Sequence, residues 1–148
     1  AIAALCTWSC PAHPDRFTSA QKERWRNRGE FDFTDTRDGA RLALSAEYLD
    51  DLEANRDAYD LVHRVATLRV PHLIVHGEAD LAVRADDARA LHDAERELGD
   101  KKLLVLRTGH TFGVADGPAV DPDNPPRPLA EASYATVMWF ARHFRKGH

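Results

Sequence analysis

Two short apolar runs, each followed at once by polar residues, most constrain what this chain can fold into. The runs are Leu73–Val75 and Leu103–Leu106. Runs of this length, bounded by proline, glycine or lysine, are typical of strands that are buried on both faces. Residues 86–98 between them have helical periodicity, with Asp86 expected as the N-cap and Gly99 just past the end. This order predicts an α/β fold in which a right-handed crossover joins two parallel neighbours.

Asp80 and His110 each follow one of these strands. Ligands of open parallel sheets bind outside the carboxyl ends of the strands, where neighbouring loops meet. An imidazole that removes a hydroxyl proton becomes cationic, and a carboxylate on its other nitrogen fixes the tautomer and stabilises that cation. We therefore expect Asp80 and His110 to form an acid and base pair. Asp86 and Asp87 are alternatives for the acid, disfavoured because they begin the helix, and Glu78 is expected to be solvated.

The segments HGEADLAV and, further along, TGHTFG resemble the C-terminal part of the alpha/beta-hydrolase superfamily. The similar branch contains dienelactone-hydrolase-like and prolyl-oligopeptidase-like enzymes. In that family H-G-x-x-D carries the triad acid and the next strand ends in G-H, which carries the base. The resemblance implies that Asp80 is the acid and His110 the base, in the family order Ser, Asp, His. Many relatives have proline after the valine that follows the acid, whereas Arg84 stands here, which leaves this loop without that stiffening.

The motif G-x-S-x-G, which carries the nucleophile in this family, does not occur in the chain. The resemblance therefore implies the C-terminal part of a serine hydrolase that cleaves ester, lactone or peptide bonds through an acyl-enzyme. Its substrate would be a small-molecule ester or a peptide. The alternative is a non-catalytic module that binds a partner through its insertion and an open sheet edge.

Two hydroxyl side chains in this chain are alternatives for the nucleophile. Ser9 follows another apolar run at the start of the chain, Ala1–Trp8, at the same expected edge of the sheet. Thr111 lies in a G-x-T-x-G segment, Gly109–Gly113. We disfavour Thr111 because those glycines are explained by a backbone that bends to present His110. Ser9 is also disfavoured, because the family's G-x-S-x-G motif does not surround it.

A metal site made of His76, Asp80 and His110 is a further alternative for hydrolytic chemistry. His72 and His76 are not a zinc pair, because four positions on a strand span about 13 Å. The zinc motif needs that spacing on a helix. We expect no metal and no cofactor.

The apolar run at the start of the chain, Ala1–Trp8, is expected to be a strand beside the one that leads to Asp80. Its outer edge would then be unpaired, and apolar unpaired edges promote association. A full hydrolase domain of this type has roughly 200–250 residues, and this chain has 148. We expect the N-terminal half of the hydrolase fold, or a second copy of this chain, to cover that edge.

Residues 11–68 are expected to form a helical cap insertion between two neighbouring strands. They contain a capping box that starts at Thr18, a hairpin that turns at residues 38–39, a helix capped by Ser45, and a helix over residues 56–65. The resemblance implies that such an insertion covers the active site. Its aromatic residues suit either an apolar pocket or the insertion's own small core: Phe17, Trp25, Phe31, Phe33 and Tyr48.

After His110, the proline-rich residues 117–128 are expected to form an irregular loop. A last helix is predicted from Pro128 to a stop at Gly147. It should pack on the sheet through an apolar face made of Ala132, Ala135, Val137, Phe140, Ala141 and Phe144.

The charge pattern and the cysteine content exclude several other classes of protein. The net charge is −4 with both signs interspersed, so no basic surface for nucleic acid is expected. The sequence has neither an apolar run of about eighteen residues nor the basic flank of a signal peptide, so no membrane partner is expected. Cys6 and Cys10 lack a second pair and are interpreted as small buried hydrophobes, not as a metal or redox pair. So few cysteines favour a reducing, cytoplasmic compartment.

Overall fold

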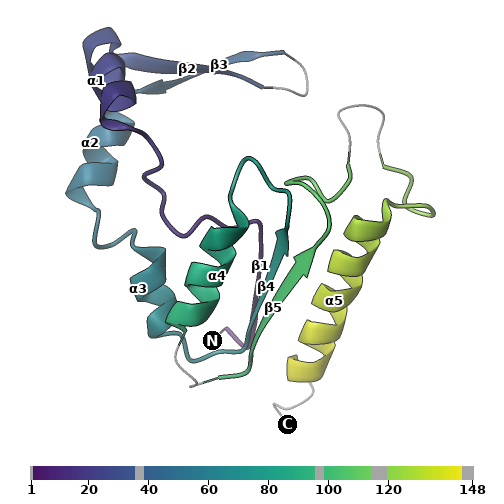
Figure 1. The fold of residues 1–148 in the computed structure, drawn as a ribbon. Helices are drawn as coiled ribbons and strands as arrows, with labels where there is room; N and C mark the ends of the chain where they lie inside the picture. Colours follow the sequence, from purple (N-terminus) through teal and green to yellow (C-terminus); the bar gives the residue numbers. More distant parts are fainter. Residues whose placement is uncertain (1, 36–38, 96–98, 115–119, 145–148) are drawn as a thin grey trace. The chain divides into compact units, whose positions relative to one another are not determined.

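The structure is a computed structural model that describes residues 2–35, 39–95, 99–114 and 120–144 (Figure 1). The chain divides into two compact units. The sheet unit comprises Ala1–Ala12 and Leu61–His148, and the insertion unit comprises His13–Asp60. No helix within the described ranges is long and apolar enough to cross a membrane.

The sheet unit is built on three parallel strands in the order β1-β4-β5. These are β1 (Leu5–Trp8), β4 (His72–Gly77) and β5 (Lys101–Leu106). Every residue of the central strand β4 is buried. The predicted parallel neighbours and the α/β fold class are confirmed, although β1 starts later than the sequence indicated.

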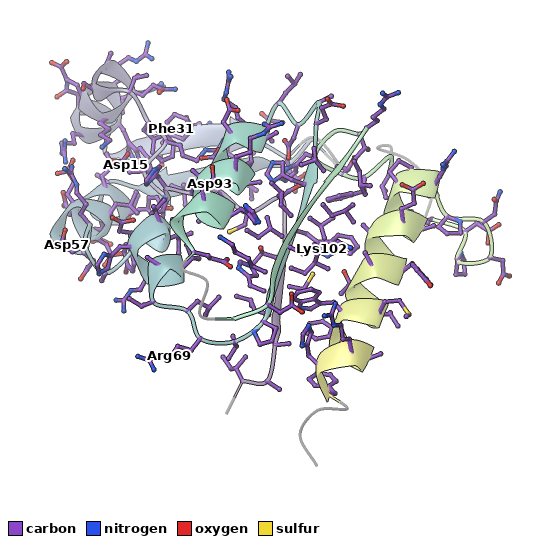
Figure 2. All side chains as sticks on the ribbon, turned by 60° about the horizontal axis from the view of Figure 1, so that its bottom comes forward. Asp15, Phe31, Asp57, Arg69, Asp93 and Lys102 are labelled. Atoms are coloured by element: carbon purple, nitrogen blue, oxygen red, sulfur yellow. The ribbon has the colours of Figure 1, made fainter. Side chains whose placement is uncertain are left out.

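Helices cover both faces of this sheet (Figure 1). The long helix α5 (Arg127–Phe144) packs on the face that carries Val75. The helices α3 (Leu61–Ala66) and α4 (Ala85–Ala94) pack on the opposite face, which carries Ile74. Successive strand residues point to opposite faces, so a strand covered on both sides buries all of its side chains, here the apolar Leu73–Val75 and two histidines, His72 and His76. Figure 2 shows the side chains that fill the space between α5 and the sheet.

The buried face of α5 differs from the predicted one. Trp139 is buried and lies on the same face as Ala132 and Ala135, at the spacing of one helical stripe. Val137 and Phe144 lie off that stripe and are 63% and 58% exposed. Their predicted burial is wrong, because the large indole of Trp139 sets the face that the sheet covers.

The predicted ends of two helices also need correction. Arg84 is the N-cap of α4 and makes no side-chain capping bond, while Asp86 lies in the first turn. The helix starts earlier than predicted, since Ala85 and Ala88 in its first turn are both buried and Ala88 packs with Ile74 of β4. The helix ends at Ala94, because Glu95 has an extended backbone with φ −66° and ψ 127°, so its predicted continuation to residue 98 is wrong. The stop predicted at Gly147 lies outside the described residues.

The insertion unit contains α1 (Ser19–Arg28), β2 (Glu30–Thr34), β3 (Arg41–Ser45) and α2 (Glu47–Ala54). The capping box that begins at Thr18 and the antiparallel pairing of β2 with β3 confirm two predictions. The residues at the tip of the hairpin, 36–38, lie outside the described ranges.

Two helix starts in this region were predicted wrongly. Ser45 is the last residue of β3, and Ala46 precedes α2 without a side-chain cap. The helix predicted from residue 56 begins only at Leu61 as α3, which lies in the sheet unit and packs against α4. Apolar packing starts at Leu61, and this explains the later start.

The aromatic residues of the insertion unit gather around Trp25, which is 1% exposed. Its ring centroid lies 5.1 Å from those of Phe17 and Phe31, and 5.9 Å from that of Tyr48. Phe33 is 41% exposed. Phe17, Trp25 and Phe31 therefore form a small core within this unit, the second of the two roles expected, and Tyr48 stacks on its edge with 39% exposure.

Candidate active site

Asp80 and His110 meet at the carboxyl edge of the sheet, after β4 and β5 respectively. The Nδ1 atom of His110 lies 2.8 Å from Oδ2 of Asp80. The carboxylate accepts this hydrogen bond, so the Nδ1 atom of the imidazole carries a hydrogen. The structure thus brings together the two side chains that their positions after neighbouring strands predicted.

The carboxylate of Asp80 is buried and is held by the backbone of its own loop. Its Oδ1 atom accepts hydrogen bonds from the N–H groups of Ala82, at 2.9 Å, and Val83, at 2.8 Å. Burial alone would raise the pKa of Asp80. The Val83 N–H and the His110 imidazole together outweigh burial and lower the pKa of Asp80 below its ordinary value. Asp80 is therefore ionised at neutral pH.

The side chain of His110 is 46% exposed, and its Nε2 atom makes no hydrogen bond to any described residue. The turn that carries it is anchored by Phe112, which is buried and whose ring centroid lies 5.0 Å from that of Trp8. An imidazole held at Nδ1 by a carboxylate and open at Nε2 can take a proton from a hydroxyl group.

Neither alternative nucleophile is bonded to the base. Ser9 is buried, has a positive φ of 45° and makes no side-chain hydrogen bond of ordinary geometry. Thr111 donates its hydroxyl hydrogen to the carbonyl oxygen of Val114 at 2.6 Å. The described residues therefore contain no hydroxyl hydrogen-bonded to His110.

The alternative acids have other partners. Asp86 forms exposed ion pairs with Arg84 and Arg89, at 3.2 and 3.3 Å. Asp87 accepts a hydrogen bond from the N–H of Ala12 at 3.3 Å. Glu78 is exposed, as expected. Asp80 is the candidate acid that contacts His110.

The metal alternative finds no support in the described ranges, where no group of three His, Cys, Asp or Glu side chains could hold a metal ion. Cys6 and Cys10 are free, half-buried thiols. Burial, and then the charge of Asp87, raise the pKa of Cys10. Both side chains pack against the apolar clusters of the sheet unit but are only partly buried, less than their interpretation as buried hydrophobes implied.

The sequence suggested His76 only as a ligand of the alternative metal site and predicted no link to the acid loop, although it belongs to the H-G-x-x-D segment. The side chain is 0% exposed, and its Nε2 atom lies 3.0 Å from the Val83 carbonyl oxygen and 3.5 Å from Oδ2 of Asp80. The signal that could have revealed it is its place on β4, two residues after Ile74 and therefore on the same face of a buried strand.

No protein-family model matches the chain, and no curated protein matches it. Among solved structures, the esterase domain of a Rhodothermus marinus protein is similar, with a TM-score of 0.59 and 20% identity over 96% of this chain and 52% of that one. A putative hydrolase from Agrobacterium vitis S4 has a TM-score of 0.60 and 14% identity over 92% of this chain and 49% of that one. The Paleococcus ferrophilus monoacylglycerol lipase has a TM-score of 0.60 and 14% identity over 96% of this chain and 60% of that one.

The chain shares its fold with part of these esterase, hydrolase and lipase structures. It spans between 49% and 60% of their lengths. At these identities the likeness concerns the fold. The predicted α/β fold, a three-stranded parallel sheet with flanking helices, therefore has structural counterparts among solved proteins.

Proposed function

We propose that this chain is the C-terminal part of a serine hydrolase in which Asp80 is the acid and His110 the base. The observation that carries this proposal is the 2.8 Å contact between His110 Nδ1 and Asp80 Oδ2 at the carboxyl edge of a parallel sheet. The similarity of fold to esterase and lipase structures supports it. The serine would come from the N-terminal half of the hydrolase fold, outside these 148 residues.

In the proposed reaction, Nε2 of His110 takes the hydroxyl proton as the serine oxygen bonds to the substrate carbonyl carbon. Asp80 stabilises the imidazolium that forms. The tetrahedral intermediate then collapses, the bond to the leaving group breaks, and His110 returns the proton to the leaving oxygen or nitrogen. Water, activated by the same imidazole, releases the acid and restores the serine. The substrate class is a small-molecule ester, a lactone or a peptide.

The insertion unit is proposed as the cap of this enzyme. It leaves the sheet after β1 and returns before β4, although these two strands pair directly. A parallel crossover needs only about a dozen residues, far fewer than this excursion contains. The aromatic core around Trp25 would let such a cap fold as a stable element.

Turnover of a p-nitrophenyl ester by the intact protein tests the assignment. Asp80→Asn should lower kcat by about 10⁴-fold, because the amide favours the wrong imidazole tautomer. Asp86→Asn is the matched control, since it changes an exposed carboxylate on the neighbouring helix, and it should leave kcat unchanged. Wild-type turnover in Asp80→Asn would remove Asp80 from the mechanism.

A further inference from the structure

His76 is a wholly buried histidine beside the proposed acid. It lies on β4, four residues before Asp80, and is 0% exposed. A polar group without a hydrogen bond is costly to bury. A polar side chain at this position therefore needs a hydrogen bond that offsets the free-energy cost of its burial.

The Nε2 atom of His76 supplies that interaction. It lies 3.0 Å from the carbonyl oxygen of Val83. A carbonyl oxygen can only accept a hydrogen bond, so Nε2 must carry a hydrogen. The same nitrogen lies 3.5 Å from Oδ2 of Asp80, which is too long for a good hydrogen bond but close enough for electrostatic attraction.

Val83 links the two side chains through its own backbone. Its N–H donates to Oδ1 of Asp80 at 2.8 Å, while its carbonyl accepts from His76. The loop that begins at Gly77 is thus closed on itself, since the Asp80 N–H also donates to the Gly77 carbonyl, at 3.3 Å. Because two backbone N–H groups occupy Oδ1, Oδ2 is left to face His110.

The hydrogen bond from His76 to the Val83 carbonyl also constrains the loop at the point where no proline follows Val83. Arg84 has an extended backbone, with φ −68° and ψ 145°, and a largely exposed side chain. The sequence therefore leaves the loop without a local constraint at this point. The buried imidazole of His76 provides the constraint from inside the sheet unit.

We propose that His76 is a positioning residue, whose Nε2–H bond to the Val83 carbonyl fixes the rotation of the Asp80 carboxylate and keeps Oδ2 directed at His110. This inference rests on the proposed roles of Asp80 and His110. His76 acts through Asp80 and touches no reacting atom.

Two substitutions separate this role from simple packing. His76→Leu has a similar volume and removes the donor, whereas His76→Gln keeps an N–H near the position of Nε2. The pKa of the Asp80 carboxyl, followed by carbon NMR, should rise in His76→Leu, because Val83 loses the bond to its carbonyl and its N–H is then held less firmly on Oδ1 of Asp80. It should stay below the ordinary value in His76→Gln.

His72→Gln is the matched control. His72 is also buried on β4, and it is bonded to Glu95 and Thr7 instead of the acid loop. Its substitution should lower the melting temperature and leave the pKa of Asp80 unchanged. If His76→Leu lowers only the melting temperature, as His72→Gln does, the proposed positioning role is wrong.

The unsubstituted chain gives an independent test if His76→Leu fails to fold. Nitrogen NMR should show the hydrogen of His76 on Nε2, with scalar coupling across the hydrogen bond to the Val83 carbonyl carbon. A hydrogen on Nδ1 alone would overturn the inference. In the intact enzyme, His76→Leu should lower kcat about 10- to 100-fold with little change in KM, and His76→Gln should restore most of it.

The outcomes distinguish this inference from the proposed function. The pKa of Asp80 and the His76 tautomer are measured without turnover. An intact protein without hydrolase activity would refute the proposed function and leave these two results as they stand. Normal activity together with an unshifted Asp80 pKa in His76→Leu would refute the role of His76 alone.

Discussion

A Cβ atom on Gly77 would lie 2.6 Å from the carbonyl oxygen of Gly109 and 2.5 Å from that of Thr108. Real Cβ atoms do not approach backbone oxygens this closely. The end of β4 and the turn that carries His110 therefore touch because residue 77 has no side chain. This contact brings the base within 2.8 Å of Asp80.

The substitution Gly77→Ala should therefore displace the His110 turn. We expect a loss of about 1–3 kcal/mol in the free energy of unfolding, the usual cost of overpacking, and loss of the Asp80–His110 hydrogen bond. Urea unfolding and the downfield Nδ1–H resonance of His110 measure the two effects. Gly109→Ala is the control, because its nearest neighbour would be the Ala79 carbonyl oxygen at 3.8 Å. Equal effects of the two substitutions would contradict the account.

The lowered pKa of Asp80 makes a prediction about acid stability. Burial opposes ionisation, but hydrogen bonds from Val83 and His110 outweigh it, so folding favours the carboxylate. The contribution of Asp80 is complete above its unfolded pKa of about 3.9 and is lost as pH falls through the lower folded value. The difference in unfolding free energy between wild type and Asp80→Asn should therefore shrink below about pH 4. A difference that stays constant from neutral to acid pH would contradict this.

A second buried pair, far from the proposed chemistry, should matter for stability alone. His72 is bonded through Nδ1 to Glu95 and through Nε2 to the hydroxyl of Thr7, at 2.9 Å for the latter. His72→Leu should cost about 3–5 kcal/mol, because it leaves a buried carboxyl group without its partner. The double variant His72→Leu/Glu95→Leu should recover most of this loss in urea unfolding. Additive losses would show that the two groups are not coupled.

The strands and the Asp80–His110 contact could be predicted because each depends on local sequence and on one rule of topology. Apolar runs bounded by Pro71 and Gly77 identify a doubly covered strand, and parallel neighbours bring their carboxyl ends to one edge. The capping box at Thr18 is likewise local, since the hydrogen bonds that form it lie within one turn.

Features decided by tertiary packing could not be predicted in the same way. Val137 and Phe144 are apolar, yet the indole of Trp139 determines which side of α5 faces the sheet. Ser45 has a side chain that favours N-cap positions, but its backbone pairs with Glu30 in the hairpin, so it ends β3 instead of starting α2. The contact of His76 with the acid loop was not predicted, because its partner is the backbone carbonyl of Val83.

The outer edge of β1 predicts self-association of the isolated chain. Within the described residues β1 pairs only with β4, and its four residues, Leu5–Trp8, carry no charge and are only half-buried. Unpaired apolar edges of this kind promote association. Sedimentation at low micromolar concentration should show dimers or aggregates that the N-terminal half of the hydrolase converts to a soluble complex. A stable monomer in which the amides of residues 3–6 resist hydrogen exchange would contradict this.

Labelling with a fluorophosphonate probe shows whether His110 activates a serine, because the probe reacts with a serine only when a base activates it. In the intact protein, we predict one labelled serine, located by peptide mapping outside these 148 residues. Labelling should be lost in His110→Ala and kept in Asp86→Asn. Labelling of Ser9, labelling that survives His110→Ala, or no labelling of the folded intact protein would contradict the account.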